Sequence, residues 1–287
     1  MKNKEIVKQV NDSIKKLAKT HPNIPTNRVR VIIALERAVA RLESHPKLAS
    51  HLIFKGGFVL FKVLINPRFT RDIDAIALGL RKSDLPKLIE SALKKDMNDG
   101  LWFGDVQTED LTDQGIYGGY RFNVAFQIGD PESESKIKKL SRVHLDVGFG
   151  DVIDPSPRRE SASSILPDGQ PLSWLVYPLE YIYSEKLEAL IDRGSASSRA
   201  KDIYDMFNLF NKISDPQKLL SAIKNTFENR KTEIPQSFVK FAEDLDTSIL
   251  RGAWNSVQLV AASLSFNEVW NSFFSQLTVL DEALNRD

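Results

Sequence analysis

The sequence predicts an α+β protein, with a sheet domain flanked by helices followed by an all-helical C-terminal half. Residues 52–78 read as a strand, a helix and a second strand, joined by a Gly-Gly turn and a basic turn. Residues 120–128 and 141–149 alternate apolar and polar side chains, which is the pattern of half-buried strands. From residue 178 onward, apolar side chains recur at the spacing of amphipathic helices. The chain therefore divides into a strand-containing half and a helical half.

The boundary between these halves is predicted within residues 154–170, which are rich in Pro, Ser, Arg and Gly. We interpret this stretch as a linker. The expected domains are residues 1–155, which include the N-terminal helices and the sheet, and residues 156–287, which are helical.

The other elements follow from their periodicity. It predicts helices over residues 6–17, 26–42 and 83–94 and a strand over residues 102–108. Pro22 and Pro25 separate the first two helices, because proline lacks the N–H that a helix interior needs. We expect these helices to pack against the sheet without taking part in chemistry.

Composition excludes some classes of site. The 287 residues are 42% hydrophobic and 27% charged, as in an ordinary globular protein. Lys plus Arg total 39 against 38 Asp plus Glu, so a nucleic acid would have to be held by a local basic patch. The absence of cysteine excludes disulfides, thiolate zinc sites and cysteine nucleophiles. The N-terminus leads into no secretory apolar run, and no apolar segment approaches the roughly 20 residues of a membrane span, so we expect a cytoplasmic protein.

The most informative stretch combines a diglycine with an Asp-x-Asp pair. Gly56 and Gly57 lack a Cβ, so their N–H groups can approach an anion closely, and the helix that follows adds its unpaired N–H groups and positive dipole end. Asp72 and Asp74 are two residues apart, so on a strand both carboxylates leave the same face. Hard oxygen ligands beside a phosphate-binding turn suit Mg²⁺. The stretch therefore predicts a site for phosphate and a divalent cation.

The same stretch resembles the signature of the DNA polymerase β-like nucleotidyltransferase superfamily. The fuller string, Lys55-Gly56-Gly57 and then Arg68-Phe69-Thr70 just before Asp72-Ile73-Asp74, is similar to the AbiEii/AbiGii toxin family of type IV toxin–antitoxin systems. The resemblance implies a polymerase β-like domain with a small mixed sheet, and a second domain that closes the nucleotide cleft. It also implies that substrate is bound by Lys55, Gly56, Gly57, Arg68 and Thr70.

A third carboxylate is needed if the protein is such an enzyme, and Asp146 is the candidate. It stands alone in the apolar strand Leu145-Asp146-Val147, where burial would be costly unless the carboxylate were paired or bound to a cation. With Asp72 and Asp74 it would hold two Mg²⁺ ions. His144 shares its face, and we interpret it as a hydrogen-bonded strand histidine.

A second informative stretch begins at Pro178, and its charged residues are Lys186, Arg193, Arg199 and Asp202. Pro178 and Gly194 are suited to the start and the end of a helix. On spacing alone, these charges could simply form a surface network between two helices. The stretch also resembles the second AbiEii-like signature, Glu-Lys-Leu-x-Ala-Leu, Arg-Gly, then Arg-x-Lys-Asp-x-Tyr-Asp. That resemblance implies that Lys186 is a point charge on the triphosphate, that Asp202 orients Lys186 or the acceptor hydroxyl, and that Arg193 and Arg199 contact substrate.

The function expected from the resemblance is transfer of a nucleoside monophosphate from a nucleoside triphosphate to an RNA acceptor, with release of pyrophosphate. The acceptor would be the 3′ end of tRNA, and growth arrest would be relieved by a cognate antitoxin. Two alternatives stay open: transfer to a small molecule such as an aminoglycoside, and a non-catalytic nucleotide-binding module. The three carboxylates and Lys186 argue against the second.

Overall fold

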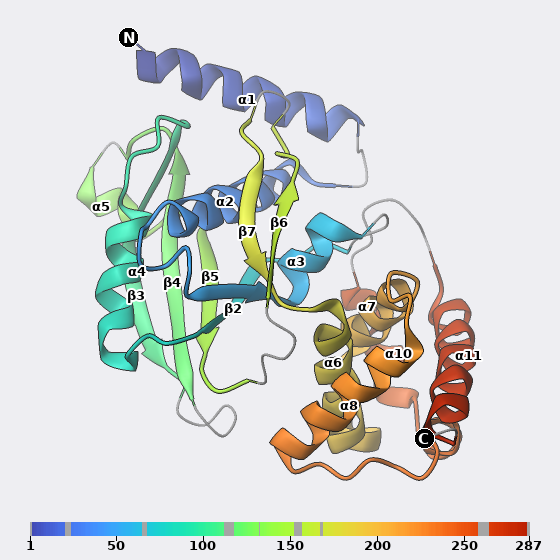
Figure 1. The fold of residues 1–287 in the computed structure, drawn as a ribbon. Helices are drawn as coiled ribbons and strands as arrows, with labels where there is room; N and C mark the ends of the chain where they lie inside the picture. Colours follow the sequence, from blue (N-terminus) through green and yellow to red (C-terminus); the bar gives the residue numbers. More distant parts are fainter. Residues whose placement is uncertain are drawn as a thin grey trace. The chain divides into compact units, whose positions relative to one another are not determined.

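The fold is that of a computed structural model (Figure 1). It describes residues 2–20, 24–64, 68–111, 118–131, 133–151, 157–166, 169–257 and 264–285. The strands are β1 (Leu52–Lys55), β2 (Asp72–Ala77), β3 (Leu101–Asp110), β4 (Gly119–Ile128), β5 (Arg142–Gly148), β6 (Arg158–Ala162) and β7 (Leu172–Val176).

The helices alternate with these strands at first and then follow one another. The α-helices are α1 (Lys2–Thr20), α2 (Thr26–Glu43), α3 (Gly56–Val63), α4 (Leu85–Leu93), α5 (Glu134–Ile137), α6 (Leu179–Arg193), α7 (Ala200–Phe210), α8 (Pro216–Arg230), α9 (Phe238–Asp244), α10 (Ser248–Ala253) and α11 (Phe266–Leu284). Short 3₁₀ turns are η1 (Lys82–Asp84), η2 (Gly194–Ala196) and η3 (Trp254–Ser256). The predicted α+β class is confirmed.

Within the described residues, seven strands form one mixed sheet in the order β3-β4-β5-β2-β1-β7-β6. The central strand β2 pairs antiparallel with β1 and parallel with β5, and β7 joins the other side of β1 in parallel. The remaining pairs, β3 with β4, β4 with β5 and β6 with β7, are antiparallel. The strand carrying Asp-x-Asp therefore lies in the middle of the sheet.

The two faces of the central strands differ in polarity. Since side chains alternate along a strand, one face carries the buried apolar residues of the pattern, among them Ile73, Ala75, Phe122, Val124, Leu145 and Val147. Trp174 of β7 is fully buried, and its ring packs against the rings of Phe54 on β1 and Phe58 on α3. The opposite face carries charged and polar residues at the β2, β4 and β5 positions described below.

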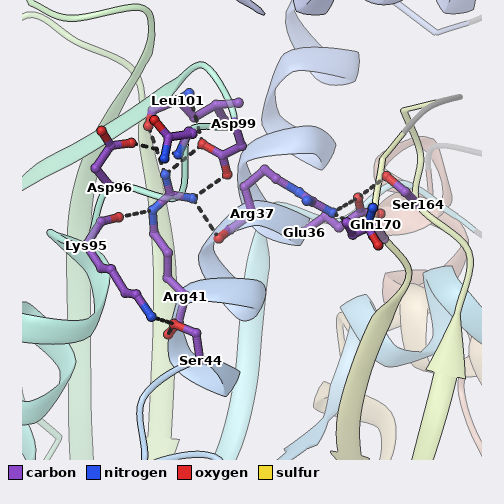
Figure 2. Close-up of polar contacts among 11 residues, drawn as sticks. Glu36, Arg37, Arg41, Ser44, Lys95, Asp96, Asp99, Leu101, Ser164 and Gln170 are labelled. Carbon is purple, nitrogen blue, oxygen red and sulfur yellow. Dashed lines mark hydrogen bonds and ion pairs between the residues drawn. The ribbon is translucent and has the colours of Figure 1, made fainter. Parts of the chain in front are cut away.

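A buried charged network follows helix α2, and Figure 2 shows most of it. We define the α2 network as Glu36, Arg37, Arg41, Lys62 and Asp99. Glu36, fully buried, accepts hydrogen bonds from Lys62 Nζ (2.6 Å), from Ser164 Oγ (2.7 Å) and from the backbone N–H of Ile165 (2.9 Å). Arg41, which is 1% exposed, donates to both oxygens of Asp99 at 2.7 and 2.8 Å and to the Leu101 carbonyl at 2.9 Å. These bonds join α2 to α3, to the turn before β3 and to the segment between β6 and β7.

The structure divides into two compact units, taken here from their described residues. The first contains Met1–Val63, Thr70–Asp151 and Pro157–Val176, and so holds the whole sheet. The second contains Tyr177–Asp287 with the short segment Leu64–Phe69. Interpreting residues 154–170 as a linker missed β6, which lies inside that stretch and pairs with β7. The predicted boundary at 155/156 lies outside the described residues, and the chain from residue 157 to 176 belongs with the sheet.

None of the helices in the described part of the chain is both long enough and apolar enough to cross a membrane.

Candidate active site

The strand register brings the three predicted carboxylates to neighbouring positions on the polar face of the sheet. In the parallel pair of β2 and β5, Asp74 lies opposite Asp146 and Asp72 lies opposite His144. Residues opposite each other on adjacent strands project from the same face. Asp72 is exposed, whereas Asp74 and Asp146 are half-buried. Sequence spacing placed the first two together, and the register adds the third.

Two cations flank the Asp74–Asp146 pair across the sheet. Lys55 on β1 lies opposite Asp74, and Arg121 on β4 lies opposite Asp146. We call these four positions, Lys55, Asp74, Asp146 and Arg121, the sheet-face row. Arg121 Nε and Nη2 donate to the two Asp146 oxygens at 2.8 and 2.7 Å, while Lys55 Nζ donates to Asp151 at 2.6 Å. The row thus places two carboxylates between two positive side chains.

The diglycine turn is shaped around Asp74. Gly56 has φ +71°, a left-handed backbone conformation that side chains with a Cβ rarely adopt. A Cβ at this position would lie 2.7 Å from Asp74 Cγ and closer still to Asp74 Oδ2. Gly56 also begins α3, whose first N–H groups have no partner within the helix. The Asp74 carboxylate therefore lies against the turn from which α3 begins.

Thr70 contacts the backbone at the start of β2. Its side chain is buried, and its hydroxyl accepts a hydrogen bond from the Asp72 N–H at 3.5 Å. This contact helps to fix the backbone from which the Asp72 carboxylate projects.

The carboxylates on the polar face of the sheet are of the chemical type that binds a divalent cation. Asp72 and Asp74 offer hard oxygen ligands from one face of one strand, and Asp146 is their neighbour on β5. Among the residues that the structure describes, however, no group of three or more His, Cys, Asp or Glu side chains is arranged to hold a metal ion. Both Asp146 oxygens instead accept hydrogen bonds from Arg121. Asp146 is therefore held by an arginine, while Asp72 and Asp74 lie on the adjacent strand β2.

The second predicted group of residues forms a cluster in the helical unit. Lys186 on α6 donates to Asp202 Oδ1 on α7 at 2.6 Å and lies 2.9 Å from Asp205 Oδ2. Arg199 donates to the other Asp202 oxygen at 3.0 Å. Arg68 donates to both oxygens of Asp205 at 2.8 and 2.7 Å. Three cations thus share two carboxylates.

Burial and charge act in opposite directions on the cluster's pKa values. Burial alone would lower the pKa of Lys186, but the charges of Asp202 and Asp205 outweigh it and the pKa is raised. Burial alone would raise the pKa of Asp202, but Lys186 and Arg199 outweigh it and the pKa is lowered. Lys186 is therefore an ammonium and Asp202 a carboxylate at neutral pH.

The structure brings together most of the predicted residues of the second stretch and adds one. Arg193 lies exposed in the last turn of α6, whereas Lys186 faces α7. Asp205, which is 1% exposed, links Arg68 to Lys186 but was given no role from the sequence. It lies three residues after Asp202 in a helix, a spacing that places both on one face and could have identified it.

Arg121 is the other residue of the site that is not predicted from the sequence. The alternation of residues 120–128 places it on the polar face of its strand, opposite to Phe122 and Val124. Its partner depends on the register of β4 against β5. That register is set by pairing between distant segments, which periodicity does not reveal.

Comparison with known proteins identifies the fold and the family. The family model described as nucleotidyl transferase AbiEii toxin, type IV TA system, matches residues 37–282. The structure of JHP933 from Helicobacter pylori is similar, with a TM-score of 0.54, 18% identity and 94% coverage of each chain. The nucleotidyltransferase toxin MenT4 from Mycobacterium tuberculosis has a TM-score of 0.59 and 14% identity, covering 93% of this chain and 89% of its own. No curated protein sequence matches the chain.

Proposed function

The chain belongs to the AbiEii nucleotidyl transferase toxin family, and from this premise we propose that it transfers a nucleoside monophosphate from a nucleoside triphosphate to RNA in a reaction that depends on Mg²⁺. The observation that carries the proposal is the register of β2 against β5. It aligns Asp74 with Asp146, and Asp72 projects from the same face two residues away. Carboxylates are the side chains that Mg²⁺ takes as ligands beside substrate phosphates.

In the proposed site, Asp72, Asp74 and Asp146 would hold two Mg²⁺ ions. When bound, the ions would supply Lewis-acid stabilisation of the charge on the phosphates and of the attacking hydroxyl. Because carboxylates repel phosphate, the triphosphate would be oriented by the N–H groups and cationic side chains described below, so that the hydroxyl attacks the α-phosphate in line and pyrophosphate leaves. The protein forms no covalent bond to the nucleotide in this scheme.

The phosphate contacts are assigned to the diglycine turn. The N–H groups of Gly56 and Gly57 point from the first turn of α3, where the helix dipole favours an anion. Gly56 also admits the Asp74 carboxylate, because any larger residue would collide with it. Lys55, which precedes the turn, is assigned to the substrate phosphates as well.

In the helical unit, Lys186 is assigned to the triphosphate as a point charge. Its raised pKa keeps it protonated, and Asp202 holds its ammonium group in place. Arg68 and Arg199, which pair with Asp205 and Asp202, are assigned to substrate phosphates together with the exposed Arg193. Asp205 is a positioning residue in this assignment, because it contacts both Arg68 and Lys186.

The acceptor is assigned to RNA, and within RNA to the 3′ end of tRNA. Membership of a toxin family of type IV systems supports this choice, and it supports a cognate antitoxin that relieves growth arrest. A chain with one net positive charge must contact RNA through local groups, so the salt dependence of binding would report how many phosphates those groups neutralise.

The test is incubation of the protein with each of the four α-labelled nucleoside triphosphates in turn, together with Mg²⁺ and total cellular RNA. The expected result is label in RNA of tRNA size, with release of pyrophosphate, for wild type and not for Asp74→Asn. Label on an added aminoglycoside and not on RNA would move the assignment to a small acceptor. Absence of Mg²⁺-dependent pyrophosphate release would leave a nucleotide-binding module. Expression in cells should arrest growth with wild type and not with Asp74→Asn.

A further inference from the structure

Arg121 holds the Asp146 carboxylate through two hydrogen bonds. Its Nε and Nη2 lie 2.8 and 2.7 Å from the two Asp146 oxygens, a two-pronged arrangement that matches the planar guanidinium to the carboxylate. The bonds form between residues that lie opposite each other on β4 and β5. The negative charge of Asp146 is therefore already balanced by a side chain of the protein.

The carboxylate that Arg121 holds belongs to the set that we assign to the cation. Asp146 lies opposite Asp74 on β2, and Asp72 projects from the same face two residues away. A cation bound to Asp146 would need the two oxygens that now accept hydrogen bonds from Arg121.

The pair is accessible enough to exchange partners. The Arg121 side chain is 38% exposed and the Asp146 side chain 21%. Their mutual hydrogen bonds join one side chain to another, so water can replace either partner when they separate. Arg41, which is 1% exposed and bonded to backbone carbonyls, has no such freedom.

We propose that Arg121 is a built-in counterion that competes with a divalent cation for Asp146 and is displaced when the cation binds. The proposal rests on the metal assignment of the proposed function. Arg121 then acts as a positioning residue. Before the cation binds, it neutralises Asp146, so that Asp146 and the carboxylates on β2 can lie side by side. It also weakens cation binding by the free energy needed to separate Arg121 from Asp146.

The test measures binding of Mn²⁺ alone, without nucleotide, by electron paramagnetic resonance or titration calorimetry. Arg121→Met removes the charge and keeps the apolar stem, and we expect it to tighten the Mn²⁺ dissociation constant about tenfold, which corresponds to about 1.4 kcal/mol. Arg121→Lys keeps the charge but loses the planar guanidinium that forms two hydrogen bonds. Its Mn²⁺ dissociation constant should lie between those of wild type and Arg121→Met. Thermal unfolding checks that each variant is folded.

The matched control is Arg142→Met. Arg142 carries the same charge on β5, but it pairs with Asp105 and Asn123 instead of Asp146. We expect this variant to change the Mn²⁺ dissociation constant less than about twofold, because the lost charge lies further from the carboxylates and is screened. Equal tightening by both variants would overturn the proposal, since it would show a general field effect.

A double-mutant cycle with Asp146→Asn completes the test. When residue 146 is a neutral asparagine, no Arg121–Asp146 ion pair has to be broken for Mn²⁺ to bind. Arg121→Met should therefore no longer tighten Mn²⁺ binding. Persistent tightening in the Asp146→Asn background, or wild-type affinity in Arg121→Met alone, would contradict the proposal. Tightening that depends on Asp146, in a protein that transfers no nucleotide, would uphold it and refute the proposed function.

Discussion

The α2 network and the sheet-face row both pair acids with bases in the sheet unit, but they differ in exposure and in the groups that satisfy them. In the α2 network, Glu36 is fully buried and Lys62 is 5% exposed, and a backbone N–H completes the bonding of Glu36. In the sheet-face row the charged groups are half-buried, and the pairs Lys55–Asp151 and Arg121–Asp146 join side chains to side chains. The α2 network fixes helix α2 against distant segments, whereas the half-buried ion pairs of the sheet-face row can separate.

This difference separates ion pairs that hold the fold from those that can serve chemistry. A buried carboxylate with every oxygen occupied is costly to disturb, because any loss leaves an uncompensated charge. A half-exposed pair is weakly favourable and is readily exchanged for another cation or for water. The comparison predicts that substitutions in the two regions move different observables.

The largest expected effect on stability comes from the α2 network. Glu36→Ala leaves Lys62 buried without its carboxylate and removes the acceptor for Ser164 and Ile165, so we expect a loss of about 3–5 kcal/mol in the free energy of unfolding. Chemical denaturation measures it. A loss below about 1 kcal/mol would show that the network does not hold the fold.

In the sheet-face row the expected effect is on activity. Asp74→Asn should lower the transfer rate by roughly a hundredfold to a thousandfold, as expected when a group that stabilises transition-state charge is lost. The free energy of unfolding should stay within about 0.5 kcal/mol of wild type, since asparagine has the size of aspartate and the position is only half-buried. Steady-state kinetics and denaturation on the same preparation test both parts. Asp84→Asn, in an exposed pair, is the matched control for loss of an acidic group.

The pH dependence of stability sharpens the comparison further. Burial would raise the pKa of Glu36, but Lys62, Ser164 and Arg37 outweigh it, so its folded pKa lies below the usual 4.5. The stabilisation from this carboxylate is therefore present above about pH 4.5 and is lost as the pH falls through the folded pKa. The difference in unfolding free energy between wild type and Glu36→Gln should be constant near neutral pH and shrink in acid. A difference that grows in acid would reverse the assigned sign.

The smallest effect is expected where an ion pair is fully open to water. Arg81 and Asp84 pair at 2.8 Å with side chains 82% and 43% exposed. Arg81→Ala should change the free energy of unfolding by less than about 0.5 kcal/mol. A larger loss would mean that exposure is a poor guide to which pairs hold the fold.

Part of the fold and site follows from the sequence, and the reasons are physical. Alternation predicted β4 and β5, and the spacing of Asp72 and Asp74 placed both carboxylates on one face. Strand β6 has no such signal, because the residues of Arg158–Ala162 are mostly exposed and the strand is held at the sheet edge by pairing with β7.

The hydrogen-bond partner of Asp146 could not be predicted from the sequence, for a different reason. Periodicity shows which face of a strand a residue occupies, but not which residue lies opposite on the next strand. Arg121 and Asp146 meet only because β4 and β5 pair in one register. The family signatures mark carboxylates and basic residues, and Arg121 stands outside them.

The central claim is that the carboxylates on β2 and β5 serve transfer of a nucleoside monophosphate. It is tested most directly by supplying the protein with one nucleoside triphosphate labelled either on its α-phosphate or on its γ-phosphate, with Mg²⁺ and RNA. We predict that only the α-label enters RNA and that Asp74→Asn lowers its rate of entry by at least about a hundredfold. Entry of the γ-label, or equal entry of the α-label with Asp74→Asn, would contradict the account.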